Sequence, residues 1–268
     1  MKMTEQKRAL SCATEAARLA GGLMRDNQHS AKKINASSSH DIKLELDVRC
    51  QRLIEKHLLA AFPAIALLGE EGEAGDTQSD CRWVVDPIDG TVNFTYGIPH
   101  ACVSIALQQR AARKADADYE DGYQTIVGVV FDPFCNELWT AIRGQPARLN
   151  GRVTRVSARP QLSEAIVSIG FAKNRANIER GLPYFAWLVR RVRKIRMMGA
   201  AALGLAYVAS GRFDAYIERG VNLWDIAAGG LIIECAGGVF RHESAGAPRK
   251  YRMVASSGAL TTKLPMPK

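Results

Sequence analysis

The sequence lacks several features that mark whole classes of protein. No apolar run among its 268 residues approaches the ~20 residues needed to cross a bilayer, and the N-terminal segment has no signal-peptide core. The chain also has no internal repeat and no low-complexity segment. These absences exclude the membrane-spanning, repetitive and disordered classes, and a hydrophobic content of 47% predicts an ordinary globular protein.

Cysteine is present, but not in the patterns that metal sites and disulfide frameworks use. None of the six cysteines belongs to a CxxC pair, which argues against a structural zinc site. Widely spaced cysteines in a chain of this length are typical of reduced thiols in the cytoplasm. We therefore expect a cytoplasmic protein whose fold depends on neither disulfides nor zinc.

Acidic residues are scarce in the second half of the chain. Residues 1–147 hold 16 basic and 20 acidic side chains, a net charge of −4, whereas residues 148–268 hold 20 and 7, a net charge of +13. Basic surfaces attract anionic substrates and polyanions such as RNA. The basic run at 190–196 therefore predicts either a solvated helix face or a surface for a subunit or an anionic partner.

Hydrophobic periodicity predicts a mixture of helices and strands in the first half. Helical spacing indicates one helix near the N-terminus and another at 47–61. Short apolar runs predict strands at 64–69, 83–85, 100–109, 125–131 and 136–142. The charged stretch at 110–122 lies between two of these strands, and we interpret it as a solvated hairpin insertion.

Beyond the Asn150-Gly151 turn, strands and helices alternate. Strands are predicted at 165–171, 192–198, 213–218 and 237–240, and helices at 176–191, 199–210 and 224–236. Gly181 and Pro183 restrict the first of these helices, which we expect to start late. The alternation predicts a layered α/β fold. We expect an N-terminal half over 1–147 and a C-terminal half over 148–268, packed as one compact unit.

Three acidic clusters follow apolar strands or begin helices, where α/β proteins gather ligands. They are residues 69–73 (GEEGE), 86–91 (DPIDGT) and 224–229 (WDIAAG). In the second cluster, Pro87 fixes a short turn that can aim Asp86 and Asp89 at one point. Hard cations such as Mg²⁺ prefer oxygen ligands of this kind. The alternative is an Asx turn with a helix cap, because aspartate favours turns in any case.

The same turn can also hold an anion. Gly90 allows close approach of a ligand to the backbone, and the N–H groups of Gly90 and Thr91 can face a phosphate. The chain has no nucleotide P-loop and no C-x₅-R phosphatase loop, and its paired aspartates are separated by two residues rather than one. These absences leave a metal-activated water as the expected nucleophile.

Taken together, the segments GEE, WVVDPIDGTVNF and LWDIAAGGLIIECAGG resemble the inositol monophosphatase family of metal-dependent, lithium-sensitive sugar phosphatases. The resemblance runs from Asp41 to Ser256 and implies an αβαβα sandwich, in agreement with the alternation above. It also implies a homodimer and about two or three Mg²⁺ ions per site, with Mn²⁺ as a substitute and Li⁺ as an inhibitor.

By position, the resemblance implies a ligand set for the cations. Glu70, Asp86 and the Ile88 carbonyl would hold the first cation. Asp86, Asp89 and Asp225 would hold the second, with Asp86 bridging the two.

The resemblance implies roles in catalysis and substrate binding as well. Thr91 and Glu70 would orient the attacking water, and Asp47 would support the threonine. Glu218 would accept a hydrogen bond from a substrate hydroxyl, and Ala201 would line the pocket. The residues implied to bind substrate are Asp89, Gly90, Thr91, Ala201, Glu218 and Asp225.

The sequence leaves the substrate open. Inositol 1-phosphate is the best single candidate, and fructose 1,6-bisphosphate, histidinol phosphate and 3′-phosphoadenosine 5′-phosphate are the alternatives. A different class, an RNA- or transcription-complex-binding protein that uses the basic half, stays open too. The chain departs from the family where a lysine often precedes Asp41, since Ala36 stands there between Lys33 and Lys43. It departs again at Ala200 and Gly204, where the family often has serine and aspartate.

Overall fold

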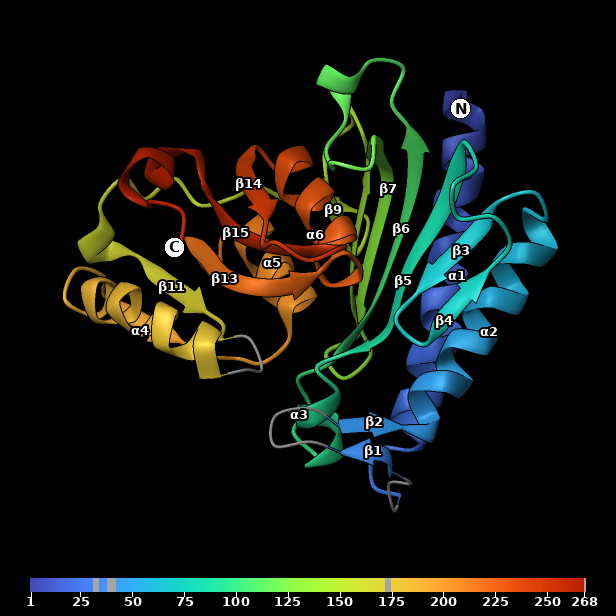
Figure 1. Cartoon of the computed structure of the whole chain (residues 1–268), viewed down its shortest axis with the longest axis horizontal. Helices are drawn as coiled ribbons and strands as arrows, with labels where there is room; N and C mark the ends of the chain where they lie inside the picture. Colours follow the sequence, from blue (N-terminus) through green and yellow to red (C-terminus); the bar gives the residue numbers. More distant parts are fainter. Residues whose placement is uncertain (31–33, 38–41, 172–174, 268) are drawn as a thin grey trace.

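The computed structural model describes residues 1–30, 34–37, 42–171 and 175–267, which form five stacked layers (Figure 1). A pair of outer helices, an eight-stranded sheet, a second pair of helices, a five-stranded sheet and one further outer helix follow one another. The αβαβα sandwich predicted from the sequence is therefore confirmed. None of the helices in these ranges is long and apolar enough to span a membrane.

The first outer layer consists of α1 (Met3–Asp26) and α2 (Glu45–Ala61), at the two helices expected from the sequence. Helix α1 buries a stripe of alanines at helical spacing, among them Ala9, Ala13 and Ala20, each fully buried. Small side chains let the helix lie close to the sheet: a Cβ on Gly21 would lie 2.6 Å from the ring of Phe131. The outer layer and the sheet share one apolar core.

The eight-stranded sheet has the order β10-β9-β8-β7-β6-β5-β3-β4. Its strands are β3 (Ala66–Gly69), β4 (Gly72–Ala74), β5 (Cys81–Asp89), β6 (Cys102–Arg110), β7 (Tyr123–Asp132), β8 (Glu137–Ile142), β9 (Arg148–Leu149) and β10 (Arg152–Val153). Strands β3 and β5 are parallel, and the other pairs are antiparallel. All five strands expected in this half are present. The Asn150-Gly151 pair was interpreted as a turn between short strands, and β9 and β10 confirm it. The sequence did not reveal β4, whose three residues are too short for a periodic signal.

The middle layer consists of α5 (Ala201–Ala209) and α6 (Leu223–Cys235), which lie between the two sheets (Figure 1). Both helices are apolar nearly all round, as expected of helices covered on two faces. Gly128 of β7 permits close approach, because a Cβ there would lie 2.8 Å from the carbonyl oxygen of Ala228 in α6. This layer contributes nearly half of the buried residues of the largest core cluster among the described residues.

The five-stranded sheet has the order β12-β11-β13-β15-β14. Its strands are β11 (Ile166–Ile169), β12 (Lys194–Arg196), β13 (Ala215–Asn222), β14 (Gly238–Ser244) and β15 (Lys250–Ser257). Strand β11 is parallel to β12 and β13, and β15 is antiparallel to both of its neighbours. The sequence analysis missed β15, in which charged and apolar residues alternate.

Helix α4 (Arg175–Val189) forms the last layer and begins earlier than expected. The late start was inferred from Gly181 and Pro183, and Pro183 does lie inside the helix. A proline removes one backbone hydrogen bond. Most of α4 is exposed, so water can satisfy the carbonyl that loses its partner, and the helix tolerates the residue.

The remaining short elements connect these layers. The strands β1 (Ile34–Ser37) and β2 (Ile42–Leu44) pair with each other, and α3 (Thr91–Thr95) follows β5 directly. The 3₁₀ turns are η1 (Lys114–Asp116), η2 (Leu162–Glu164) and η3 (Gly258–Lys263). Because β10 still belongs to the first sheet, the chain passes to the second sheet between Val153 and Ile166.

The insertion at 110–122 is a hairpin extension between β6 and β7, but it is not merely solvated as the sequence analysis expected. The ring of Tyr119 is 5% exposed and stacks on His242 of β14 at 4.8 Å between centroids. It also meets Tyr251 of β15 edge-on at 5.5 Å. An apolar ring in a charged segment thus docks the first sheet's hairpin onto the second sheet.

Candidate functional site

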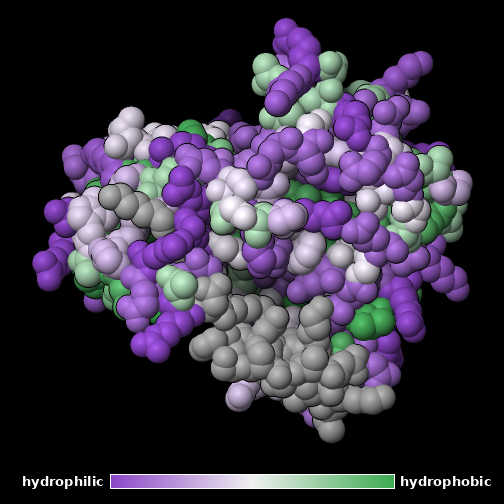
Figure 2. All heavy atoms as spheres, viewed as in Figure 1, coloured by the Kyte–Doolittle hydropathy of each residue, from purple (hydrophilic) through white to green (hydrophobic). Residues whose placement is uncertain are grey.

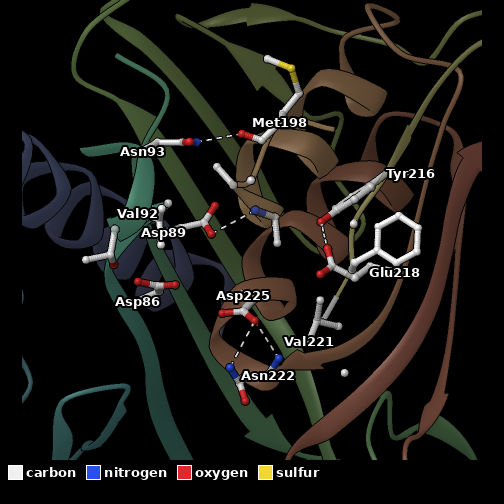
Figure 3. A pocket seen from close by; sticks show the side chains of 18 of the residues that line it. Asp86, Asp89, Val92, Asn93, Met198, Tyr216, Glu218, Val221, Asn222 and Asp225 are labelled. Atoms are coloured by element: carbon white, nitrogen blue, oxygen red, sulfur yellow. Dashed lines mark hydrogen bonds between the residues drawn. The ribbon is translucent and has the colours of Figure 1, made fainter. Parts of the chain in front are cut away.

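A cavity of about 520 Å³ opens where β5, α3, α5, α6 and β13 meet. Its wall includes Glu70, Asp86, Asp89, Asp225 and Glu218, which belong to four separate segments of the chain. Figure 3 shows Asp86 and Asp89 facing Asp225 and Glu218 across this space. The structure therefore brings the acidic clusters of the sequence to one place.

The DPIDG turn presents several groups to the cavity. The ladder between β5 and β6 shifts register between Asp86 and Asp89, as the turn requires. Asp86 Oδ1 accepts the N–H of Ile88 at 3.0 Å, and the Ile88 carbonyl accepts the hydroxyl of Thr91 at 2.9 Å. Gly90 has φ of +92°, and a Cβ there would lie 2.9 Å from the carbonyl oxygen of His100. Only glycine suits this position on both counts.

Asp89 also caps a helix of the other half of the molecule. Its Oδ1 accepts the N–H of Ala201 at 3.0 Å, and its Oδ2 accepts that of Ala202 at 2.7 Å. A carboxylate at a helix N-terminus is favoured by the free N–H groups and by the helix dipole. Nearby, Asn93 donates to the carbonyl oxygens of His100 and Met198, at 2.9 and 2.8 Å. These bonds fix the turn after β5 against the N-terminus of α5.

Asp225 occupies the equivalent place on α6. It is the third residue of that helix, and its Oδ2 accepts the backbone N–H of Asn222 at 2.7 Å. Its position at the helix start explains why an acidic residue is stable between two sheets. Asn222 lines the cavity as well. The sequence analysis missed it, although asparagine three residues before aspartate is a helix-start signal.

The carboxylates are close enough to perturb one another. Asp86 is 2% exposed, and its pKa is raised by burial first and then by the charges of Glu70, Asp89, Asp225 and Asp47. Burial also raises the pKa of Asp89, against the lowering effect of the backbone N–H groups that it accepts. So dense a set of buried acids disfavours its own ionised state, and a divalent cation would restore it.

Among the residues that the structure describes, no three His, Cys, Asp or Glu side chains form a ready-made metal site. The reason lies in the hydrogen bonds above, because Asp89 and Asp225 direct their oxygens to backbone N–H groups. The donor set itself is made of oxygen atoms and carries several negative charges, as Mg²⁺ and Mn²⁺ prefer. The residues therefore fit a divalent cation in the chemistry of their donor atoms.

Asp47 is the one predicted site residue that does not line the cavity. It is 3% exposed, and its Oδ2 accepts the N–H of Leu44 at the start of α2. Its charge still reaches Asp86, whose pKa it helps to raise. Gly90, Thr91, Ile88 and Ala201 all line the cavity as expected.

The far wall of the cavity holds Glu218 and a residue that the sequence analysis missed. Tyr216 lines the cavity, is 4% exposed, and donates its hydroxyl proton to Oε2 of Glu218. The two residues lie two positions apart on β13, so their side chains point to the same face of the sheet. No motif singled out this tyrosine, because its partner and its surroundings come together only in the fold.

Comparison with known proteins agrees with this geometry. The family model described as the inositol monophosphatase family matches residues 5–265. The chain belongs to the inositol monophosphatase family. It is thereby a member of a family of metal-dependent phosphatases, as the sequence resemblance implied.

Relatives of this family member carry two kinds of name. A protein of Xylella fastidiosa named Nus factor SuhB is 40% identical over 250 residues, covering 91% of this chain and 86% of the relative. An inositol-1-monophosphatase of Rhizobium meliloti is 40% identical over 208 residues, covering 77% of this chain and 74% of the relative.

Solved structures show the same fold. The extragenic suppressor protein SuhB of Bartonella henselae aligns with a TM-score of 0.84 at 33% identity, over 95% of both chains. The inositol monophosphatase of an Anabaena (Nostoc) species aligns with a TM-score of 0.80 at 30% identity, over 96% of this chain and 94% of that one.

Other residues weighed in the sequence lie away from the chemistry. Glu73 is exposed and pairs with Arg249 at 2.5 Å, as expected of a loop acid. Trp224 packs against the central core, and His100 is 8% exposed beside the ring of Tyr207. Lys33 lies outside the described residues, as do the side chains of Ala36 and Lys43.

Proposed function

We propose that this chain is a Mg²⁺-dependent phosphatase that hydrolyses the monoester of a small phosphorylated polyol, with inositol 1-phosphate as the first candidate. The observation that carries the proposal is the buried carboxylate of Asp86, which lies with those of Glu70, Asp89 and Asp225 at one end of a cavity. A hydroxyl acceptor, Glu218, stands on the other wall of the same cavity. Cation binding at one side and polyol binding at the other are what this reaction requires.

The proposal assigns the cations to specific oxygens. Glu70, Asp86 and the Ile88 carbonyl would hold one cation, and Asp86, Asp89 and Asp225 would hold another, within a total of about two or three. When bound, these cations supply charge neutralisation for the phosphate and activation of the attacking water. Mn²⁺ is the expected substitute and Li⁺ the expected inhibitor.

The chain's own groups bind and orient the reactants. The backbone N–H groups of Gly90 and Thr91 hold the phosphate, and the Thr91 hydroxyl together with Glu70 orients water towards phosphorus. Asp47 keeps the threonine in place. Glu218, Asp89 and Asp225 accept hydrogen bonds from substrate hydroxyls, and Ala201 shapes the wall between them.

A panel of phosphate esters tests the proposal. Phosphate release is measured from inositol 1-phosphate, fructose 1,6-bisphosphate, histidinol phosphate and 3′-phosphoadenosine 5′-phosphate, with Mg²⁺, with added Li⁺ and with EDTA. We expect turnover that needs Mg²⁺, is inhibited by Li⁺, and falls by about 100-fold or more in Asp225→Asn. Absence of release from every ester, or full activity of Asp225→Asn, contradicts the proposal.

A second candidate function follows from the charge distribution. The C-terminal half carries a net charge of +13, and the five basic side chains at 190–196 are all exposed along the end of α4 and β12. Some relatives are named Nus factors. A role in binding RNA or a transcription complex therefore stands beside the phosphatase activity, because a basic surface attracts polyanions. We place the protein in the cytoplasm as a homodimer, and the free thiols of all six cysteines agree with that compartment.

RNA affinity separates the two functions. We expect binding that weakens steeply with salt and is lost when Arg191, Arg193 and Lys194 are changed to glutamine, while phosphatase activity persists. Binding that ignores these three substitutions removes the second candidate. Gel-shift titrations at two salt concentrations provide the measurement.

A further inference from the structure

The carboxylate of Glu218 accepts a hydrogen bond from a neighbouring side chain on the same strand. Tyr216 and Glu218 lie two residues apart on β13 and face the same side of the second sheet. The Tyr216 hydroxyl donates to Oε2 of Glu218, and both residues line the cavity (Figure 3). The hydroxyl has a single proton, and this bond fixes its direction.

Two glycines from other elements make room for this pair. A Cβ at Gly170, just after β11, would lie 1.9 Å from Oε2 of Glu218. A Cβ at Gly204, inside α5, would lie 2.9 Å from Cδ1 of the Tyr216 ring. Any larger residue at either place would displace the carboxylate or the ring. Three elements distant in sequence thus leave a space shaped for one tyrosine–glutamate pair.

We propose that Tyr216 is a positioning residue that makes the cavity selective for hydroxyl-bearing monophosphates, by holding Glu218 as a fixed hydrogen-bond acceptor. The inference rests on the proposed function and deepens it. An ionised carboxylate that has accepted one hydrogen bond keeps capacity for others, so it can receive the proton of a substrate hydroxyl. The same negative charge repels a second phosphate placed there.

The surroundings keep the tyrosine a donor. Burial and the charge of Glu218 raise the pKa of Tyr216 well above its usual value, so the phenol stays protonated at all working pH values. A donor with a fixed direction orients the Glu218 carboxylate, and a correctly oriented acceptor binds a substrate hydroxyl more tightly. Removal of the hydroxyl takes away this directed restraint on the carboxylate, which lies against Gly170.

The test compares two substrates in Tyr216→Phe. For inositol 1-phosphate, we expect KM to rise about tenfold with kcat changed less than about threefold, because a directed hydrogen bond to a charged group is lost from the bound state. For p-nitrophenyl phosphate, which has no hydroxyl for Glu218 to accept, we expect the KM to change less than about twofold. An equal rise for both esters overturns the inference, since it indicates a general structural defect.

Matched variants separate positioning from folding. Tyr184→Phe is the control, because it removes a hydroxyl that donates to the carbonyl oxygen of Pro265 at 2.8 Å, away from the cavity. It should leave both KM values unchanged. In a Glu218→Gln background, Tyr216→Phe should add less than about twofold to the KM for inositol 1-phosphate. A full, additive effect in that background contradicts the coupling.

Gly204→Ala provides a route that does not alter the hydroxyl. The added methyl group meets the Tyr216 ring, so we expect the same selective rise in KM for inositol 1-phosphate. Unchanged selectivity in both Tyr216→Phe and Gly204→Ala overturns the inference while the phosphatase stands. A wild-type protein that hydrolyses neither ester overturns the proposed function itself, and the inference with it.

Discussion

Asp89 shows how one residue can serve both folding and chemistry. Its two oxygens accept the N–H groups of Ala201 and Ala202, and the same carboxylate faces Asp86 and Asp225 in the cavity. An asparagine in its place has only one acceptor oxygen, and its side-chain NH₂ group would face the backbone N–H of Ala201 or Ala202.

We therefore expect Asp89→Asn to lower both activity and stability. Loss of a charged acceptor in the proposed cation site should reduce kcat by about 100-fold or more. Loss of a charged helix cap should lower the free energy of unfolding by about 1–2 kcal/mol. Phosphate release and urea unfolding provide the two measurements. Asp80→Asn, at an exposed position, should change neither, and a fully stable Asp89→Asn would contradict the capping role.

Residue chemistry was the most readable part of the sequence. Each of the three acidic clusters sends carboxylates to one cavity: Glu70 from the first, Asp86 and Asp89 from the second, and Asp225 from the third. Acids that follow buried strands or begin buried helices gather where α/β proteins bind ligands. Tyr216 was not readable. Its role depends on Gly170 and Gly204, which lie against the Tyr216–Glu218 pair in the fold. The sequence of β13 itself contains no signal for these contacts.

At the scale of elements, the turn after β5 depends on a glycine with two independent restrictions. Gly90 has φ of +92° and lies against the carbonyl of His100, whereas Gly97, with φ of +73°, has no atom within 4 Å of a would-be Cβ. Both glycines have the positive φ that strains other residues, but only Gly90 lies close to another part of the backbone.

A pair of alanine variants separates these effects. Gly97→Ala should cost about 1–2 kcal/mol, the strain of a left-handed residue. Gly90→Ala should cost about 2 kcal/mol more and should also abolish phosphate release, because the turn that carries Asp89 and Thr91 must shift. Chemical denaturation and activity assays measure both. Equal costs at the two glycines would show that the contact with His100 is unimportant.

Elements with a strong local pattern were predictable, and elements set by distant neighbours were not. The alanine stripe of α1 was evident from its helical spacing, and α5 and α6 were predicted as helices that alternate with strands. Strand β15 was missed because its charged residues suggest a surface segment, yet Met253, Val254 and Ala255 are fully buried in the sheet. Pairing with β13 and β14 creates that strand, and pairing is not a local property.

At the scale of the whole molecule, the 110–122 hairpin ties the two sheets together. Arg82 of β5 is fully buried, lies 3.7 Å from the centre of the Tyr123 ring, and pairs with Asp121 at 2.5 Å. Asp118 pairs with Arg143 at 2.5 Å, while Tyr119 stacks on His242. Asp118 and Asp121, which looked solvated in the sequence, are therefore paired with arginines outside the hairpin.

This contact predicts a pH dependence of stability. Burial lowers the pKa of His242 to about 4, so the histidine is neutral in the fold. Between about pH 6.5 and 4 the unfolded chain binds a proton that the folded chain does not, and stability falls as the pH falls through that window. From pH 6.5 to 5 the loss from this residue should be about 2 kcal/mol.

His242→Phe isolates that contribution from the other titrating groups. The variant keeps an aromatic ring against Tyr119 and removes the proton acceptor, so its unfolding free energy should fall less steeply on acidification than that of the wild type. Urea unfolding at several pH values from 7 to 4.5 measures the difference between the two slopes. Parallel curves would show that His242 is protonated in the folded state.

The placement of α5 and α6 has a consequence for how the protein is made. A ribosome completes the strands of the first sheet through β8 before it reaches α5 at Ala201 and α6 at Leu223. At roughly 5–20 residues per second, several seconds pass in which one face of that sheet has no cover. During synthesis the nascent chain must therefore expose an apolar β-sheet face, and we expect molecular chaperones to hold it until the middle helices emerge.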